Sequence, residues 1–207
     1  MLGAIIGDVI GSPYEFDSDK TKDFMLFVPG CRPTDDSVLT IAVGCACAEA
    51  DCNNEYEFKK ILAEKLRGIG LQYPDAGYGK RFYQWMIMNE EEPCGGYTNG
   101  SAMRVSPTAW AVDTLEAVER LAKWSAEITH SHPEGIKGAQ AVAAAIFMAR
   151  SGFEKDEIRE YIEANYYDLD FTVEEVDELI ATANDIIDNP DKYCEKCKRK
   201  KLATLFF

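Results

Sequence analysis

The chain has 207 residues, of which 46% are hydrophobic and 11% aromatic, a composition typical of a globular protein and not of a disordered one. Its 36 acidic residues outnumber its 22 basic residues, and the net charge at pH 7 is −14. This charge disfavours nucleic acid and anionic membranes as partners, so a phosphate-bearing ligand needs local help from backbone amides, helix N-termini or bound cations.

The N-terminal stretch predicts a helix followed by a loop. Branched apolar residues cluster between glycines over residues 3–11, a pattern that favours a short, tightly packed helix. Asp8 lies within this helix. Pro13 then breaks the helix into a loop that carries Glu15 and continues to residue 33.

Four polar residues, Thr34, Asp35, Asp36 and Ser37, precede an apolar run that predicts a buried helix extending to about Ala50. One interpretation is a helix cap, in which Thr34 or Asp35 accepts hydrogen bonds from the first amides and the acidic pair complements the helix dipole. The other is a site for a hard metal ion, because Mg²⁺ takes oxygen ligands and is often held by one or two carboxylates. These four residues alone leave both interpretations open.

Further along the chain, Asn53 or Asn54 is expected to cap a helix over residues 55–68, and a second amphipathic helix is expected to end near Asn89. The glycine-rich window 94–101 then leads into an expected helical run at residues 102–105. A glycine loop at a helix N-terminus lets backbone amides approach an anion, although a plain turn between helices explains the same window.

The remaining sequence predicts only helices and short connections. The expected helices restart at Pro107, follow the capping-box spacing of Asp113 to Glu116, and then cover residues 139–150, 154–165 and 172–188. No alternating strand pattern, heptad or repeat is present, and the prediction is therefore an all-α fold, a compact multi-helix bundle.

Seven cysteines and the absence of a secretory signal or a membrane-spanning run predict a reduced, cytoplasmic protein. Cys45 and Cys47 are expected to act as small buried hydrophobic residues. The single C-x-x-C pair, Cys194 and Cys197, has no partner pair and is weak evidence for zinc.

Several of these features share one chemical theme. Asp8, Glu15, Asp35 and Asp36 are carboxylates near helix ends, and other windows supply a ring, backbone donors and histidines. The last group comprises Tyr97 with its neighbouring glycines, His130 and His132. This inventory indicates an anionic, ring-bearing ligand that is held partly through divalent cations.

The sequence resembles the ADP-ribosylglycohydrolase family, which includes the dinitrogenase reductase-activating glycohydrolases. The matching stretches occur in family order within about residues 1–180: Gly3 to Glu15, Pro33 to Ser37, Asn99 to Val105, and Thr129 to His132 followed by Gly135, Gly138 and Ala139. The resemblance implies an all-α bundle that holds two Mg²⁺ or Mn²⁺ ions and hydrolyses the bond between ADP-ribose and an acceptor.

The resemblance also implies roles for individual residues. Thr34, Asp35 and Asp36 would bind metal, and Glu15 would act in catalysis together with Asp35 and Asp36. The residues implied to contact the ADP-ribose are Gly95, Gly96, Tyr97, Asn99, Gly100 and His130. Thr98 stands where many members carry glycine, which alters the loop backbone.

One departure from the family concerns the C-terminal part. The family's C-terminal Asp-x-Asp-Thr/Ser segment, which supplies further metal ligands, has no counterpart here, since Asp168 and Asp170 stand in a different context. The expected organisation is a single helical domain over residues 1–190, with a basic, cysteine-containing tail at 191–207 in place of the family's last helices.

The predicted function is metal-dependent hydrolysis of ADP-ribose from a modified protein or small molecule. No membrane partner is expected, and nucleic acid is expected only as a modified substrate. Two alternatives are a non-catalytic ADP-ribose-binding module and a truncated, inactive member of the family.

Overall fold

A computed structural model describes residues 1–16, 23–90, 92–95 and 98–167, and within these ranges the chain contains helices and no strand, which confirms the all-α prediction. None of the described helices combines the length and the apolar character that crossing a membrane requires. The elements are α1 (Leu2–Gly11), η1 (Ser12–Tyr14), α2 (Asp35–Glu49), α3 (Glu55–Gly70), α4 (Lys80–Met88), η2 (Asn99–Ser101), α5 (Thr108–Ala111), α6 (Leu115–Glu127), α7 (Pro133–Arg150) and α8 (Lys155–Asn165).

The chain divides into two compact units, Met1–Ile158 and Arg159–Phe207. In the described part of the second unit, Arg159 forms an ion pair with Glu163 at 2.7 Å. The predicted domain boundary between residues 190 and 191, the predicted helix at 172–188 and the Cys194/Cys197 pair lie outside the described residues and stay predictions.

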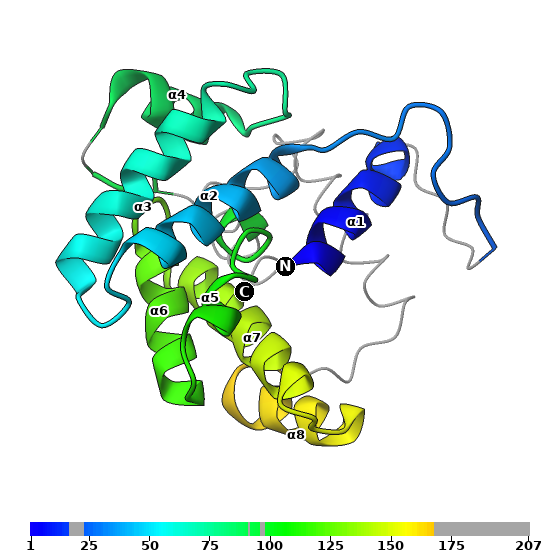
Figure 1. Cartoon of the computed structure of the whole chain (residues 1–207), viewed down its shortest axis with the longest axis vertical. Helices are drawn as coiled ribbons and strands as arrows, with labels where there is room; N and C mark the ends of the chain where they lie inside the picture. The colour runs from blue at the N-terminus through cyan, green and yellow to red at the C-terminus, as the bar shows by residue number, and fades with distance from the viewer. Residues whose placement is uncertain (17–22, 91, 96–97, 168–207) are drawn as a thin grey trace, which may run out of the picture. The chain divides into compact units, whose positions relative to one another are not determined.

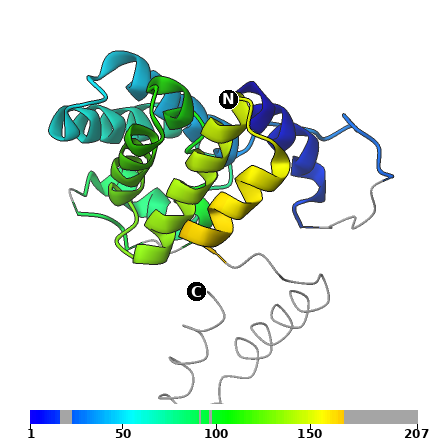
Figure 2. The same ribbon diagram turned by 90° about the horizontal axis from the view of Figure 1, so that it is seen from below.

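The core of the first unit forms where α2 lies along α3 and α6 lies along α7 (Figure 1), and the turned view keeps α6 and α7 side by side (Figure 2). Large side chains fill the first interface, among them Leu39, Phe58 and Trp85. Small residues dominate the second, as Ala122 and Ala139 illustrate, and small side chains allow two helices to approach closely. The expected close packing of the alanine-rich helix is therefore confirmed.

Local capping explains where α2, α3, α6 and α7 begin. The side chains of Thr34, Asn54, Thr114 and His132 each accept a hydrogen bond from an amide in the first turn of the following helix. Helix α7 begins at Pro133, six residues before the predicted start at 139, because His132 caps it and proline suits the first helical position.

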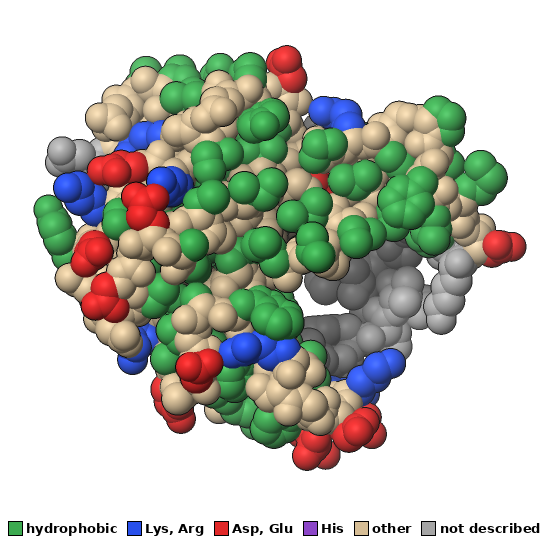
Figure 3. Space-filling view, viewed as in Figure 1, with side chains coloured by type: hydrophobic (Ala, Val, Ile, Leu, Met, Phe, Trp, Pro, Cys, Tyr) green, Lys and Arg blue, Asp and Glu red, His purple; other side chains and the backbone are tan. Residues whose placement is uncertain are grey.

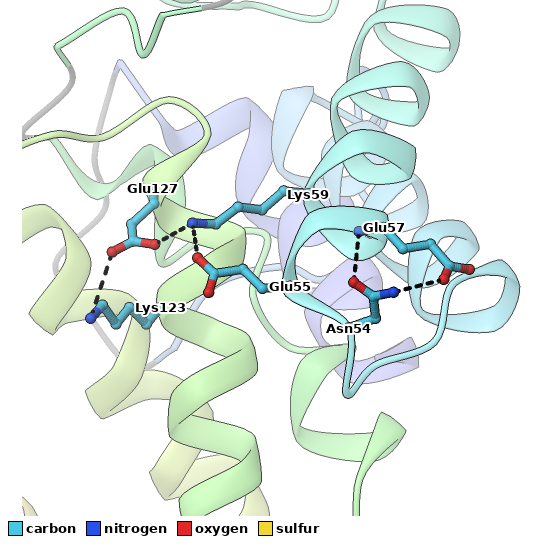
Figure 4. A network of polar contacts seen from close by, with 6 residues as sticks. All are labelled: Asn54, Glu55, Glu57, Lys59, Lys123 and Glu127. Carbon is cyan, nitrogen blue, oxygen red and sulfur yellow. Dashed lines mark hydrogen bonds and ion pairs between the residues drawn. The ribbon is translucent and has the colours of Figure 1, made fainter.

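A polar network joins α3 to α6 on the surface (Figure 4). The Lys59 ammonium lies 2.5 Å from a carboxylate oxygen of Glu55 and 2.7 Å from one of Glu127, which also pairs with Lys123 at 3.7 Å. These groups are partly exposed, so each pair contributes only about 0–1 kcal/mol, and the apolar core supplies most of the attachment.

Helix α1 has the predicted position but not the predicted packing. None of its residues is buried, and Leu2 and Ile6 are 72% and 48% exposed. Helix α1 contacts α2, yet its best-covered apolar residues, Ile5, Val9 and Ile10, are only partly buried. Figure 3 shows hydrophobic side chains gathered over this part of the surface. The predicted burial of Cys45 is also wrong, because this side chain is exposed on α2.

Candidate active site

The start of α2 is held by a carboxylate from α1. Asp8 accepts hydrogen bonds from the backbone N–H groups of Thr34, at 2.8 Å, and Ser37, at 3.2 Å, and from both of their hydroxyls. The first amides of a helix have no partners within it, so an acid at this position satisfies them and complements the helix dipole. Asp8, considered from sequence as a possible metal ligand, therefore acts here as a cap that joins α1 to α2.

The same helix start gathers further acidic groups, which we call the acidic side: Glu15, Asp35 and Asp36. Burial and then the negative charge of Asp36 raise the pKa of Asp35 to about 6, and the carboxylates of Glu15 and Asp8 add to this effect. Burial, followed by the charges of Asp8 and Glu15, also raises the pKa of Asp36. The structure thus brings Glu15 close enough to both aspartates to interact with them electrostatically.

The donors of the acidic side are hard oxygen atoms, and a divalent cation would offset the burial and the mutual repulsion that raise the pKa of both aspartates. Within the described ranges, however, no three His, Cys, Asp or Glu residues are arranged to hold a metal ion. The Thr34 hydroxyl is already engaged, since it donates to Asp8 and accepts from the Asp36 amide. The donor set fits one Mg²⁺ held by one or two carboxylates, with waters or ligand oxygens completing its coordination.

A cavity of about 500 Å³ adjoins this cluster. It is lined by residues from the starts of α2 and α4, from the glycine loop and from the segment after α6. Those that matter most for its chemistry are Asp35, Lys80, Arg81, Asn99, Gly100 and His130. A cavity of this size and mixed polarity suits a small polar ligand.

Lys80 and Arg81 were not identified from the sequence, although they supply positive charge to the cavity wall. They occupy the first turn of α4, where the helix dipole disfavours cations. Two basic residues at a helix N-terminus are thus a signal in the sequence that could have indicated an anion site. The loop before α4 is tied to the acidic side, since the Asp35 amide donates to the carbonyl of Ala76 at 2.9 Å.

We call a second group of residues the histidine side: Arg104, Thr129 and His130, all of which are buried. In contrast to the acidic side, this group contains a cation. Arg104 Nη2 donates to Thr129 Oγ1 at 2.7 Å, and this oxygen lies 2.8 Å from Nδ1 of His130. Burial and then the positive charge of Arg104 lower the pKa of His130 to about 4, while the backbone carbonyl of Thr98 offsets this in part. His130 is therefore neutral at physiological pH.

The glycine loop differs from its predicted form. The end of the window forms the single turn η2 and further turns follow it, so the expected helical run at residues 102–105 is wrong. Gly95 has a φ of 69°, a conformation that favours glycine. The Ser101 hydroxyl donates to the carbonyl of Gly135 at 2.6 Å and ties η2 to the first turn of α7.

The predicted site residues fall into three groups. Asp35, Asn99, Gly100 and His130 line the one cavity. Glu15 and Asp36 interact with Asp35 through their charges, and Thr34 caps the same helix. Gly95 is not among the lining residues, and Gly96 and Tyr97 lie outside the described residues.

Comparison with known proteins adds an independent finding. A model of the ADP-ribosylglycohydrolase family matches residues 1–204. The chain is 26% identical over 187 residues to ADP-ribosylhydrolase ARH3 of Mus musculus, an alignment that covers 76% of this chain and 50% of that protein. The corresponding protein of Gallus gallus is 27% identical over 185 residues, with 73% and 49% covered. The chain thus spans about half the length of these relatives.

A shorter similarity involves a different kind of protein. Over 39 residues the chain is 51% identical to the catalytic subunit of aspartate carbamoyltransferase of Clostridium novyi. This stretch is 19% of the present chain and 13% of that subunit.

Proposed function

Because this chain belongs to the ADP-ribosylglycohydrolase family, we propose that it hydrolyses the bond between ADP-ribose and an acceptor with the help of a divalent cation. The observation that carries this proposal is the shared cavity, which is lined by Asp35, His130 and the basic residues Lys80 and Arg81. A diphosphate needs positive charge, a sugar and a base need polar and apolar contacts, and a cation needs carboxylates. All of these groups adjoin the same space.

The proposed binding mode follows from the charges on the cavity wall. Lys80 and Arg81 attract the diphosphate and offset locally the repulsion from a chain with a net charge of −14. Asn99, Gly100 and His130 contact the ribose or the adenine. In this proposal the loop residues Gly95, Gly96 and Tyr97 complete the cradle for the diphosphate and ribose.

The proposed chemistry breaks the bond between the ribose C1 atom and the acceptor. Water supplies a hydroxyl group to C1 and a proton to the departing acceptor. Mg²⁺ or Mn²⁺ at Thr34, Asp35 and Asp36 would supply positive charge that orients the water and the ribose hydroxyls. Glu15 is exposed and interacts electrostatically with these aspartates, and in this proposal its carboxylate takes up or donates the proton. Within the described residues no three His, Cys, Asp or Glu side chains form a metal-holding group, so the two ions that the family resemblance implies would need further ligands.

The proposed partners are an ADP-ribosylated protein or small molecule, met in the cytoplasm. The cysteines of the described ranges are all free thiols, which agrees with a reducing compartment. The acceptor is identified by experiment: peptides ADP-ribosylated on serine or on arginine are incubated with the chain, and released ADP-ribose is measured by mass spectrometry. We expect release with Mg²⁺ or Mn²⁺ and none with chelator. No release from either peptide with either ion, under conditions where a full-length family member is active, would contradict hydrolysis.

A second candidate is a module that binds ADP-ribose without cleaving it. It is favoured by the lack of a three-residue metal cluster within the described part of the chain, whereas the cavity and the histidine side are present. Calorimetry separates the candidates, because ADP-ribose binding to a simple module would be the same in Mg²⁺ and in chelator.

A further inference from the structure

Arg104 is an unusual buried cation. Its side chain is 1% exposed, and no carboxylate pairs with it among the described residues; its nearest charge-compensating contacts are neutral oxygens and the ring of Phe82, whose centroid is 5.7 Å away. Burying a charge without a counter-ion is costly, so its retention calls for a specific role. Nη2 donates to the Ser125 carbonyl at 3.2 Å and to the Thr129 hydroxyl at 2.7 Å.

The contact with Thr129 determines the direction of the next hydrogen bond. A guanidinium group has only donors, so Thr129 Oγ1 acts as the acceptor in this contact, and its own proton is free for a second hydrogen bond. Thr129 is fully buried, and within the described structure the one acceptor in reach of this hydroxyl is Nδ1 of His130, at 2.8 Å. A ring nitrogen that accepts carries no proton. In a neutral imidazole the proton then resides on Nε2.

His130 lines the ligand cavity, and Nε2 is the ring nitrogen that Thr129 leaves for a ligand. This Nε2 atom is buried and makes no hydrogen bond within the described residues, although the Thr98 carbonyl lies close enough to the ring to raise its pKa in part. The ring lies against Gly100, where an added Cβ atom would be 3.4 Å from Cε1 and 3.6 Å from Nε2. Both His130 and Gly100 line the cavity. A buried donor without a partner is unfavourable until an acceptor arrives, and the cavity is where a ligand acceptor would be.

We propose that Arg104 and Thr129 are positioning residues that fix His130 in its Nε2–H form, so that the cavity presents a neutral donor to an acceptor atom of the ligand. The identity of that ligand as ADP-ribose rests on the proposed function, whereas the tautomer does not. A neutral donor favours a hydroxyl, carbonyl or ring-nitrogen acceptor of the nucleoside, while Lys80 and Arg81 provide for the diphosphate.

Nuclear magnetic resonance of the free protein tests the tautomer directly. The chain has two histidines, so ¹⁵N-histidine labelling gives two ring systems, and the variant His132→Gln assigns them by elimination. For His130 we expect a protonated Nε2 and an unprotonated Nδ1 at every pH from 5 to 8. A protonated Nδ1, or a doubly protonated ring at pH 6, would overturn the proposal even if ADP-ribose binds.

Two substitutions at Thr129 test the relay. Thr129→Val removes the hydroxyl and keeps the shape, and we expect a mixture of tautomers with ADP-ribose affinity lower by roughly five- to tenfold, the effect of one hydrogen bond. Thr129→Ser keeps the hydroxyl and should restore both the tautomer and the affinity.

If Thr129→Val does not fold, the wild-type spectrum and the Thr129→Ser variant still test the proposed tautomer of His130. Equal tautomers and equal affinities in the valine and serine variants would overturn the role of Thr129. A wild-type protein that shows the Nε2–H form but binds no ADP-ribose would instead contradict the proposed function and leave the relay standing, with nucleosides as the next probe.

Discussion

The histidine side and the acidic side of the cavity differ in whether the described side chains alone stabilise the charged groups there. On the histidine side a buried cation is bonded to neutral oxygens, and burial followed by the charge of this cation lowers the pKa of His130 to about 4. On the acidic side burial and then the neighbouring carboxylates raise the pKa of Asp35 to about 6. The first arrangement is ready to bind a ligand, whereas the second is unfavourable until a cation or a proton arrives.

This contrast separates two kinds of contribution. Hydrogen bonds within one compact unit prepare the histidine side, and their donors and acceptors come from neighbouring segments. The acidic side needs a cation or a proton, which the described side chains do not supply. Binding and catalysis should therefore respond differently to metal, pH and mutation.

The largest expected effect comes from Asp35→Asn, which removes a charge from the acidic side. We expect the rate of ADP-ribose release to fall by about 100-fold or more, because a metal-holding carboxylate is lost. Thermal stability at pH 7 without metal should rise, since the wild-type carboxylate is ionised there against an environment that disfavours its charge. Asp156→Asn is the matched control, because it removes a first-turn acid from α8 and should change neither quantity. Full activity in Asp35→Asn would refute the assignment.

The next effect is the pH dependence of metal binding. Asp35 binds a cation only when ionised, and its pKa in the folded protein is about 6, so Mg²⁺ or Mn²⁺ affinity should rise with pH, level off above 6, and fall about tenfold per unit below it. The shift in melting temperature on adding either ion at each pH measures this. Without metal the sign is opposite: a raised carboxyl pKa means that this group favours folding below about pH 4 and that the benefit is lost as pH rises through 6. A metal affinity that does not change between pH 5 and 7 would show that Asp35 is not a ligand.

A smaller effect is expected at the start of α4. Lys80→Gln and Arg81→Gln should each weaken ADP-ribose binding by roughly threefold to tenfold at low salt, and the difference should shrink as salt screens the charge. Lys155→Gln is the matched control, since Lys155 is also the first residue of a helix but does not line the cavity. If the control weakens binding as much as the two variants do, the effect reflects net charge and not the cavity wall.

The smallest effect concerns pH and ligand binding in chelator. His130 stays neutral well above its pKa of about 4, so ADP-ribose affinity without metal should change by less than about twofold between pH 5 and 8. Isothermal titration calorimetry over this range provides the measurement. A change centred near pH 6 would mean that the acidic side, and not the histidine side, controls binding.

The sequence predicts the features that depend on short-range chemistry. Thr34 and Asn54 cap their helices as expected, because a cap needs only a side chain and an amide two or three residues away. The family stretches also place Asp35 and His130 in one site, and both line the cavity. The metal ions and the roles of Thr34 and Glu15 stay predictions.

Features that depend on contacts between distant segments were not predictable in this way. Nothing near Arg104 in the sequence indicates that it reaches Thr129, 25 residues later, or that Asp8 caps a helix 26 residues away. The burial of α1 was mispredicted because an apolar pattern shows that a surface can be buried but does not show what covers it.

Calorimetric titration with ADP-ribose, in Mg²⁺ and in chelator, tests the contrast between the two sides most directly. The wild-type chain should bind in both conditions and more tightly in Mg²⁺. His130→Gln should weaken binding in both conditions, whereas Asp35→Asn should remove only the gain from Mg²⁺. The account would be contradicted if Mg²⁺ gave no gain in the wild type, or if Asp35→Asn and His130→Gln had the same effect in chelator.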